Sequence, residues 1–401
     1  MSLVSFGEIL LEPIRNGLTK PKAVRGNGVK MIAMGEIFAC SRIGNIKMDR
    51  VPVTDKEKKN CAIKEGDLLF ARQSLVLEGA GKCSIVTSVT EDTVFESHLI
   101  RARIDPQKAN PYFFYYFFNS YMGRESIKTI VEQVAAAGIR GSDLIRLAVP
   151  YPPLNVQNRV VALLDSVDRK IELNNEINDN LQQQAAAIFK SWFVNFAPFG
   201  DTAPKEWGDA KLEELTTLVS RGIAPKYSDT SDQTVINQKC IRNHMIDLSL
   251  ARAHIPKAIN EKWLRFGDLL INSTGDGTLG RAAQVWFQPQ NLTVDSHITI
   301  VRPAKENLIF YIGLWGTLHE KEIESLHTGS TGQTELPRDR IKMMELLLPD
   351  DETLNRFNAV IAPMATAIVS NQKENQKLAT LRDTLLPKLM SGGLDVSQLD
   401  I

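Results

Sequence analysis

The chain of 401 residues has few cysteines and no long apolar run, and each shortage excludes a class of protein. Its four cysteines lie far apart without a CxxC pair, so neither a disulfide framework nor a cysteine zinc site is expected. No apolar run approaches the roughly 18 residues that a membrane-spanning helix needs. The N-terminal residues have no basic start and no small-residue cleavage site, unlike a secretory signal. We therefore expect a cytoplasmic protein that makes no membrane contact.

The chain also lacks an excess of positive charge, because 47 Lys and Arg balance 47 Asp and Glu. Phosphate binders usually carry surplus basic side chains, so this balance first argues against a nucleic-acid partner. The balance is uneven along the chain, however. Residues 1–150 hold 21 basic and 16 acidic side chains, whereas residues 201–349 hold 17 and 19. Neutrality therefore excludes a strongly basic, non-specific DNA binder, but it does not exclude a sequence-specific one.

An internal repeat is the main feature that the sequence does contain. The segment from Pro152, PPLNVQNRVVALLDSVDRKIELNNEINDNL, aligns without a gap with the segment from Pro349, PDDETLNRFNAVIAPMATAIVSNQKENQKL. Upstream, Gly-Asp-Leu-Leu and Ser-His both occur twice, starting at Gly66 and Gly267 and at Ser97 and Ser296. The matches keep one order, with offsets of about 197–205 residues, and so indicate a duplication.

The duplication predicts an α+β protein in which two mixed α/β domains alternate with two long helices. Short alternating segments such as GKCSIVTSV and HITIVRP predict mostly antiparallel strands in each domain, followed by one helix from Asn110 and one from Asn307. The aromatic cluster 112–118 could stack on bases, but a buried helix face explains it better. The expected boundaries are residues 1–151 for the first domain, 152–196 for the first helix, 197–348 for the second domain and 349–401 for the second helix and tail.

Both long helices carry a heptad seam, with apolar positions at alternating spacings of four and three. Each seam has two asparagines at its centre, Asn174 and Asn178 in the first and Asn371 and Asn375 in the second. Buried polar seam residues lower stability but fix register, and in an antiparallel pair these amides would meet. The prediction is an intramolecular antiparallel coiled coil. A coiled coil with other chains and a solvated asparagine stripe are the alternatives.

No fragment of the sequence predicts catalysis, a metal or a cofactor. Gly275–Gly280 fits GxGxxG, but a strand-like segment follows it instead of the helix that binds a pyrophosphate. The repeated Ser-His lacks an acidic partner, so a structural role is favoured over nucleophilic catalysis. The six histidines never reach metal-ligand spacing. We expect no catalytic residue, no metal site and no cofactor.

Together these pieces resemble the specificity subunit of type I restriction–modification systems. The resemblance covers nearly the whole chain and rests on the Gly-Asp-Leu-Leu strand starts, the Gly-x-x-Gly-Lys/Arg turns, Ser330–Gln333, Pro152–Leu154, IFKSWFVNFAPF and LLPKLMSGG. Two departures occur. The first copy has Ala137–Gly141 where the second has its Thr-Gly-Gln loop, and the second helix opens with Pro-Asp-Asp.

The resemblance implies a non-catalytic subunit with two target recognition domains, each reading one half of a split double-stranded DNA sequence. It also implies that methyltransferase subunits dock on the helices and that a restriction (translocase) subunit joins the assembly. Two other functions stay open. One is a tandem-repeat scaffold that binds only protein, which footprinting with the methyltransferase would distinguish. The other is a DNA methyltransferase or nuclease, which binding of S-adenosylmethionine by the isolated chain would reveal.

Loop residues that offer phosphate donors or base-edge amides are the candidate DNA contacts. A solvated surface role is the alternative for each of them. In the first domain the candidates are Lys20, Lys22, Arg25, Arg72, Gln73 and Arg140. In the second domain they are Arg221, Lys226, Tyr227, Asn272, Thr331 and Gln333.

Overall fold

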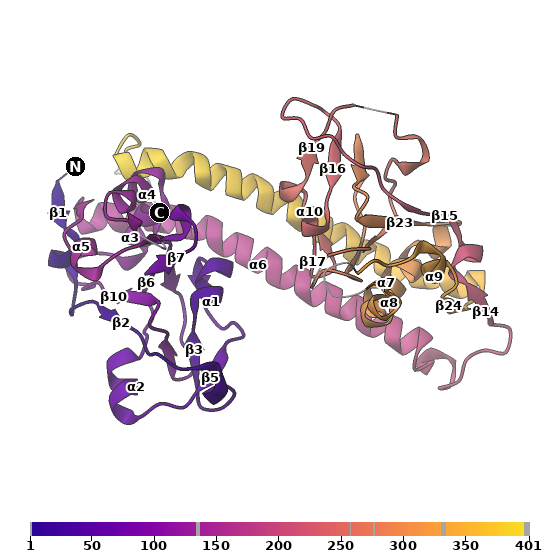
Figure 1. Ribbon diagram of the computed structural model, residues 1–401, viewed down its shortest axis with the longest axis horizontal. Helices are drawn as coiled ribbons and strands as arrows, with labels where there is room; N and C mark the ends of the chain where they lie inside the picture. Colours follow the sequence, from indigo (N-terminus) through magenta and orange to yellow (C-terminus); the bar gives the residue numbers. More distant parts are fainter. Residues whose placement is uncertain (1, 134–136, 257, 276, 330–333, 397–401) are drawn as a thin grey trace. The chain divides into compact units, whose positions relative to one another are not determined.

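The computed structural model describes residues 2–133, 137–256, 258–275, 277–329 and 334–396, and the chain divides into two compact units. The first unit consists of Met1–Ile171 and Gln376–Ile401, and the second of Glu172–Asn375. The division falls within two long helices, α6 (Leu154–Phe193) and α10 (Asp351–Ser391). Each unit therefore contains a domain together with one stretch of each helix (Figure 1).

The first unit is built around a sheet with the strand order β2-β10-β6-β8-β4. Alternate residues of its central strand enter different hydrophobic clusters, since successive side chains of a strand point to opposite faces. Leu68 and Phe70 join a cluster that includes helix residues of α6 and α10, whereas Leu69 joins a separate one. The strands are β2 (Arg15–Asn16), β4 (Arg42–Ile43), β6 (Leu68–Ala71), β8 (Cys83–Val86) and β10 (Leu99–Ala102).

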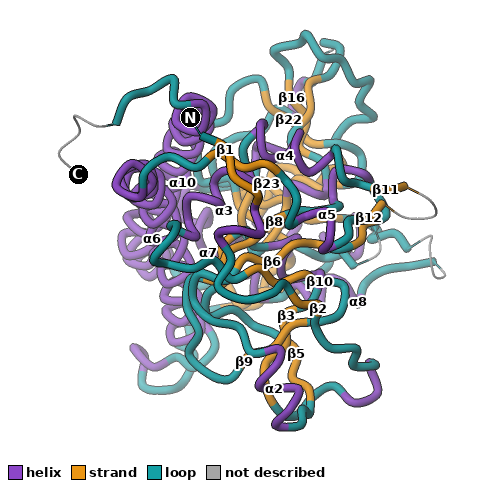
Figure 2. The backbone as a smooth tube through the Cα atoms, turned by 90° about the vertical axis from the view of Figure 1, so that its left-hand side faces the viewer, coloured by secondary structure: helices purple, strands orange, loops and turns teal. Residues whose placement is uncertain are grey.

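Smaller sheets and short helices complete the first unit. Figure 2 shows α2 beside β3 and β5, and the hairpin of β11 and β12. The sheets are β1 (Leu3–Ser5) with β13 (Ala148–Pro150), β5 (Asp49–Val51) with β3 (Val29–Ile32) and β9 (Thr93–Phe95), and β11 (Glu132–Gln133) with β12 (Ala137–Gly138) and β7 (Gln73–Ser74). The helices are α1 (Met34–Ala39), α2 (Asp55–Cys61), α3 (Pro111–Asn119), α4 (Tyr121–Lys128) and α5 (Gly141–Leu144).

The helix predicted from Asn110 is interrupted, so that prediction was wrong in one respect. Ser120 has extended backbone angles and separates α3 from α4, and its Oγ accepts a hydrogen bond from the Gly123 N–H at 3.2 Å. A serine in this position caps the second helix and satisfies one of its free N–H groups. The aromatic residues of α3 from Phe113 onward are buried, as predicted for a core-facing helix.

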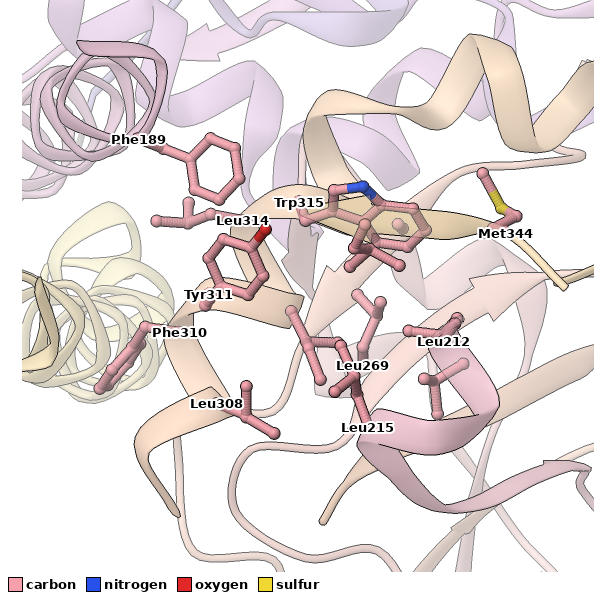
Figure 3. Packing of buried hydrophobic residues seen from close by; sticks show 14 of the residues in the cluster. Phe189, Leu212, Leu215, Leu269, Leu308, Phe310, Tyr311, Leu314, Trp315 and Met344 are labelled. Atoms are coloured by element: carbon pink, nitrogen blue, oxygen red, sulfur yellow. The ribbon is translucent and has the colours of Figure 1, made fainter. Parts of the chain in front are cut away.

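The second unit repeats this architecture around a sheet with the order β15-β23-β20-β21. Its core includes Phe189 of α6 and Tyr311 of α7, whose stacked rings have centroids 5.5 Å apart (Figure 3). The strands are β14 (Gly208–Lys211), β15 (Thr216–Arg221), β16 (Thr234–Ile236), β17 (Ile241–Arg242), β18 (Met245–Ile246), β19 (Arg252–Ala253), β20 (Leu269–Asn272), β21 (Ala282–Gln284), β22 (Leu292–Val294), β23 (Ile298–Pro303) and β24 (Glu345–Leu348). The helices are α7 (Ile309–Leu318), α8 (Glu320–Ser325) and α9 (Arg338–Lys342).

The repeated Gly-Asp-Leu-Leu motif builds the same buried ion pair in each unit. Asp67 is fully buried and bonds Nε and Nη2 of Arg103, both at 2.7 Å. Asp268 is also fully buried and bonds Nε and Nη2 of Arg302 at 2.8 and 2.7 Å. Each carboxylate also accepts the N–H of the residue three positions earlier, which closes the turn before the strand. The motif therefore fixes the start of a central strand in each unit.

A repeated glycine makes the two units equivalent at another point. Gly17 and Gly222 both run against a neighbouring strand, where a Cβ would collide with the carbonyl oxygen of Phe95 or Val294. Each following residue makes a parallel bridge to that strand, Leu18 to Glu96 and Ile223 to Asp295. The structural match therefore aligns Asn16 with Arg221, the residues that precede these glycines.

Helices α6 and α10 lie side by side and antiparallel within each unit (Figure 1). In the first unit, Asp168 of α6 is buried and accepts hydrogen bonds from Arg382 of α10 at 2.9 Å and from Tyr116 at 2.7 Å. In the second unit, seam asparagines from the two helices meet directly. The predicted α+β fold with an intramolecular antiparallel helix pair is confirmed. Among the described residues, no helix combines the length and apolar character that a membrane span requires.

Candidate nucleic-acid interface

Three predicted DNA contacts of the first domain, Arg72, Gln73 and Arg140, lie around one pocket of about 380 Å³. Backbone pairing brings them together from distant parts of the sequence. Gln73 pairs with Gly138 between β7 and β12, and the Ile139 N–H donates to the Arg72 carbonyl at 2.9 Å. These two contacts place residues 72–73 next to residues 138–140 at the surface of the unit.

The pocket combines guanidinium and amide groups. The Arg140 guanidinium lies 2.7 Å from the exposed Glu132 carboxylate. The Gln73 Oε1 lies 3.1 Å from Nδ1 of His98, and Asn16 completes the polar lining. Guanidinium groups bind phosphate oxygens and guanine edges, and carboxamides bind adenine edges. The pocket therefore presents guanidinium and carboxamide groups, with one carboxylate at its rim.

Lys20 and Arg25 lie outside this pocket and are already paired with carboxylates. Lys20 is 2.9 Å from Glu57, and Arg25 is 3.0 Å from Asp49. The pKa of the Glu57 carboxyl is lowered by the hydrogen bond from the Thr54 backbone N–H and then by Lys20. Lys22 is exposed on a short 3₁₀ turn. Of these three, Lys22 offers its ammonium group most freely to a phosphate.

In the second domain, Arg221 occupies the position that Asn16 has in the first. Its Nη1 is 2.7 Å from Glu335, and its Nη2 donates to the Leu336 carbonyl at 3.0 Å. Thr274 matches Gln73, and its hydroxyl lies 2.7 Å from Nδ1 of His297. Both repeated histidines therefore orient the polar side chain that follows a central strand. Sequence reasoning missed His98, His297, Asn16 and Thr274 as members of the site, although the repeated Ser-His was the available signal.

The other second-domain candidates lie in different environments. Asn272 is fully buried on β20 and donates to the Gln238 carbonyl at 3.1 Å, so its amide has no exposed surface. Lys226 is exposed, and the ring of Tyr227 is covered by the guanidinium of Arg252, 3.7 Å from the ring centroid. Burial raises the pKa of the Tyr227 hydroxyl. Arg252 is a further basic residue at this surface that the sequence did not single out.

Thr331 and Gln333 lie outside the described residues. Residues on both sides of them are described. Glu335 forms one antiparallel β-bridge with Thr328 and another with Thr274. The Leu336 N–H donates to the Ser273 carbonyl as the Ile139 N–H does to that of Arg72, which aligns Leu336 with Ile139. The flanks of this loop are therefore held beside the second-domain equivalent of the first-domain pocket.

The seam asparagines form two adjacent polar layers in the second unit. The Nδ2 of Asn174 donates to Asn375 at 2.8 Å, and the Nδ2 of Asn371 donates to Asn178 at 2.9 Å. Asn174 and Asn178 are both buried. Within the described residues, Oδ1 of Asn174 and Nδ2 of Asn178 have no hydrogen-bond partner. A shift of one helix along the other would leave more of these buried amides without partners and would therefore cost stability. A polar layer specifies register in this way.

The described part of the chain contains no group of three or more His, Cys, Asp or Glu side chains placed to hold a metal ion. Burial raises the pKa of the thiols of Cys61, Cys83 and Cys240. A protonated, buried thiol is a poor nucleophile.

The chain is similar to known proteins in both sequence and fold. Residues 14–183 match the type I restriction modification DNA specificity domain. The chain is 24% identical over 374 residues to the Type I restriction enzyme MjaIX specificity subunit of Methanocaldococcus jannaschii, covering 86% of this chain and 82% of the relative. It is 21% identical over 403 residues to the HindI specificity subunit of Haemophilus influenzae, covering 82% and 87%. The crystal structure of a type I restriction-modification system S subunit from M. genitalium has the same fold, with a TM-score of 0.59 at 15% identity over 97% of this chain and 95% of that chain.

Proposed function

Because the chain is related to the specificity subunits of type I restriction enzymes, we propose that it is the DNA-recognition subunit of such a system. It reads a bipartite double-stranded target, with one domain for each half-site. The observation that carries this proposal is the pocket of Arg72, Gln73 and Arg140, together with its altered counterpart around Arg221 and Thr274. A repeated backbone frame that presents different side chains is suited to reading two different sequences.

The first domain reads its half-site through that pocket. Arg72 and Arg140 supply bidentate donors for guanine or phosphate, and Gln73 supplies a carboxamide for adenine. In the second domain, Arg221 and the residues beside Glu335 serve the same purpose, with Lys226 and Arg252 contacting phosphates. The predicted contacts Thr331 and Gln333 belong to this second surface in the proposal.

The methyltransferase subunits dock on the helix pair. Leu173 and Ile177 are one helical turn apart on α6, and 50% and 40% of their surfaces are exposed. Exposed apolar side chains at a spacing of four form one face, which is typical of a surface that a partner covers. A restriction (translocase) subunit joins the larger assembly through those partners. The chain itself supplies recognition, while its partners supply the chemistry.

The test is to co-express the chain with the methyltransferase subunit of its own system and to map methylated sites in the host DNA. We expect methylation at a split sequence, and only when both proteins are present. Three results would contradict the proposal. Partner binding without a preferred DNA sequence would indicate a protein scaffold. Binding of S-adenosylmethionine by the chain alone, or DNA modification or cleavage by it, would indicate an enzyme.

A further inference from the structure

The turn that follows Gln73 exposes three consecutive apolar side chains. Leu75 is 97% exposed, Val76 is 58% exposed and Leu77 is 38% exposed. Isolated exposed leucines are common, but a contiguous exposed apolar segment usually marks a surface that a partner covers. The turn lies in the connection between β6 and β8, so it belongs to the same loop as Arg72 and Gln73.

This turn is held in place at both ends. On its first side, β7 (Gln73–Ser74) pairs with β12, and the Ser74 Oγ accepts the Val76 N–H at 3.2 Å. On its second side, the Arg124 guanidinium of α4 donates to the carbonyls of Ala80 at 3.2 Å and Gly81 at 2.9 Å. The apolar side chains therefore lie on a turn that is anchored at both ends, and the loop cannot readily rearrange to bury them.

The neighbourhood favours a nucleic acid over a protein partner. Arg72 begins the connection, and Glu78 is the only carboxylate between it and Lys82, whose ammonium donates to the Phe38 carbonyl at 2.9 Å. The pocket of Arg72, Gln73 and Arg140 is continuous with the turn through β7. DNA-binding proteins combine such basic contacts with apolar wedges that enter between base steps. In the second domain, the corresponding turn contains Gly275 and Gly277, and its Leu279 is buried.

We propose that the Leu75–Leu77 turn is an apolar wedge that packs between bases at the edge of the first half-site. This inference rests on the proposed function and adds a contact for which residues 275–278 of the second domain offer no large apolar side chain in the sequence. Leu75 makes the main contact with the bases, because its side chain is almost wholly exposed. Unstacking one base step lets more of the duplex lie against the pocket, and the apolar side chains replace the lost stacking contacts.

The test uses the full chain bound to its methyltransferase subunit and the bipartite DNA that this complex selects from a random library. 2-Aminopurine replaces single bases along the first half-site, because its fluorescence rises when it unstacks. We expect Leu75→Ser to lower DNA affinity about tenfold, because the variant no longer buries a leucine side chain against the bases. The variant should also abolish the fluorescence rise. Leu75→Met should keep both. The matched control is Tyr121→Ser, which alters an apolar side chain 73% exposed on α4 and should change neither.

The outcomes separate this inference from the function on which it rests. If no bipartite DNA is selected, both are overturned. If Arg72→Ala weakens binding while Leu75→Ser leaves affinity and fluorescence unchanged, the wedge alone is overturned. If Leu75→Ser releases the methyltransferase subunit, the turn is a protein-docking site and the wedge is again overturned. Unchanged thermal unfolding of Leu75→Ser confirms that the variant is folded.

Discussion

At the scale of single residues, the buried ion pairs Asp67–Arg103 and Asp268–Arg302 explain why Gly-Asp-Leu-Leu occurs twice. A buried carboxylate is costly unless a partner with good geometry satisfies it. Here the guanidinium meets it with two hydrogen bonds, and a backbone N–H supplies another. The pair therefore links the start of one central strand to its antiparallel neighbour.

The first prediction follows from this pair. Asp268→Asn should lower the free energy of unfolding of the second unit by about 3 kcal/mol, because Arg302 would stay buried without a compensating charge. Urea unfolding followed by tryptophan fluorescence measures the change. Asp339→Asn is the control, because Asp339 is exposed and its ion pair with Lys342 spans 3.7 Å. A loss no greater than that of the control would contradict a structural role for Asp268.

The second prediction concerns the first-domain pocket. Arg72→Ala should weaken binding to the bipartite DNA by about tenfold or relax the bases accepted at the first half-site, since a bidentate arginine contributes about 1–3 kcal/mol of discrimination. The second half-site should be read unchanged. Competition binding with variants of each half-site measures both effects. Equal affinity across all sequences, or an equal loss at both half-sites, would contradict the assignment.

Residue type and loop position pointed to Arg72, Gln73 and Arg140, which the structure places around one pocket, but they did not show where every candidate lies. Lys20 and Arg25 meet carboxylates that are far away in sequence, at Glu57 and Asp49. Asn272 lies in a strand that is buried on both faces, where Ala71 is its counterpart. Burial and long-range pairing depend on the assembled sheet. The sequence of a single loop cannot reveal them.

At the scale of elements, the helix pair was the most predictable part of the fold. A heptad seam sustained over many turns defines both the helix and the face that it buries. The strands were less predictable, because β2 and β4 contain two residues each and depend on their neighbours for stability. The break between α3 and α4 at Ser120 was also missed, since the aromatic run continues the helical pattern up to it.

The third prediction tests the polar layers of the helix pair. Asn375→Leu should destabilise the chain by about 1–3 kcal/mol, because the buried amide of Asn174 loses a partner. The double variant Asn174→Leu/Asn375→Leu should recover that loss but specify register less strictly. Urea unfolding and analytical ultracentrifugation measure stability and association. Asn180→Leu on the exposed face of α6 is the control. If the double variant stays a single monomeric species and Asn375→Leu matches the control, the layers do not fix register.

At the scale of the whole molecule, the equal numbers of basic and acidic residues reflect two domains of different charge. Residues 1–150 carry the basic excess, while residues 201–349 do not. Part of the basic excess is also spent on internal ion pairs such as Lys20–Glu57 and Arg25–Asp49. In the proposed function, the partner subunits therefore supply many of the phosphate contacts. The DNA affinity of the assembled complex should therefore fall with salt concentration more steeply than the basic side chains of this chain alone would produce.

The fourth prediction treats the helices as the determinant of spacing between half-sites. Duplicating Ile171–Ile177 in α6 and Ile368–Glu374 in α10 adds one heptad to each helix and keeps the seam in phase. Seven helical residues add about 10.5 Å, which corresponds to about three base pairs. We expect the preferred spacer to lengthen by that amount while the recognised bases stay the same. Four-residue insertions at the same points are the control, because they break the seam and should abolish binding.

The most direct test of the central claim is selection of DNA from a random library by the chain assembled with its methyltransferase subunit. Reading by two domains predicts two short conserved blocks separated by a spacer of fixed length and free sequence. The Arg72→Ala complex should then degrade one block and leave the other intact. A single continuous motif, or no enrichment with the partner present, would contradict the claim that each domain reads one half of a split target.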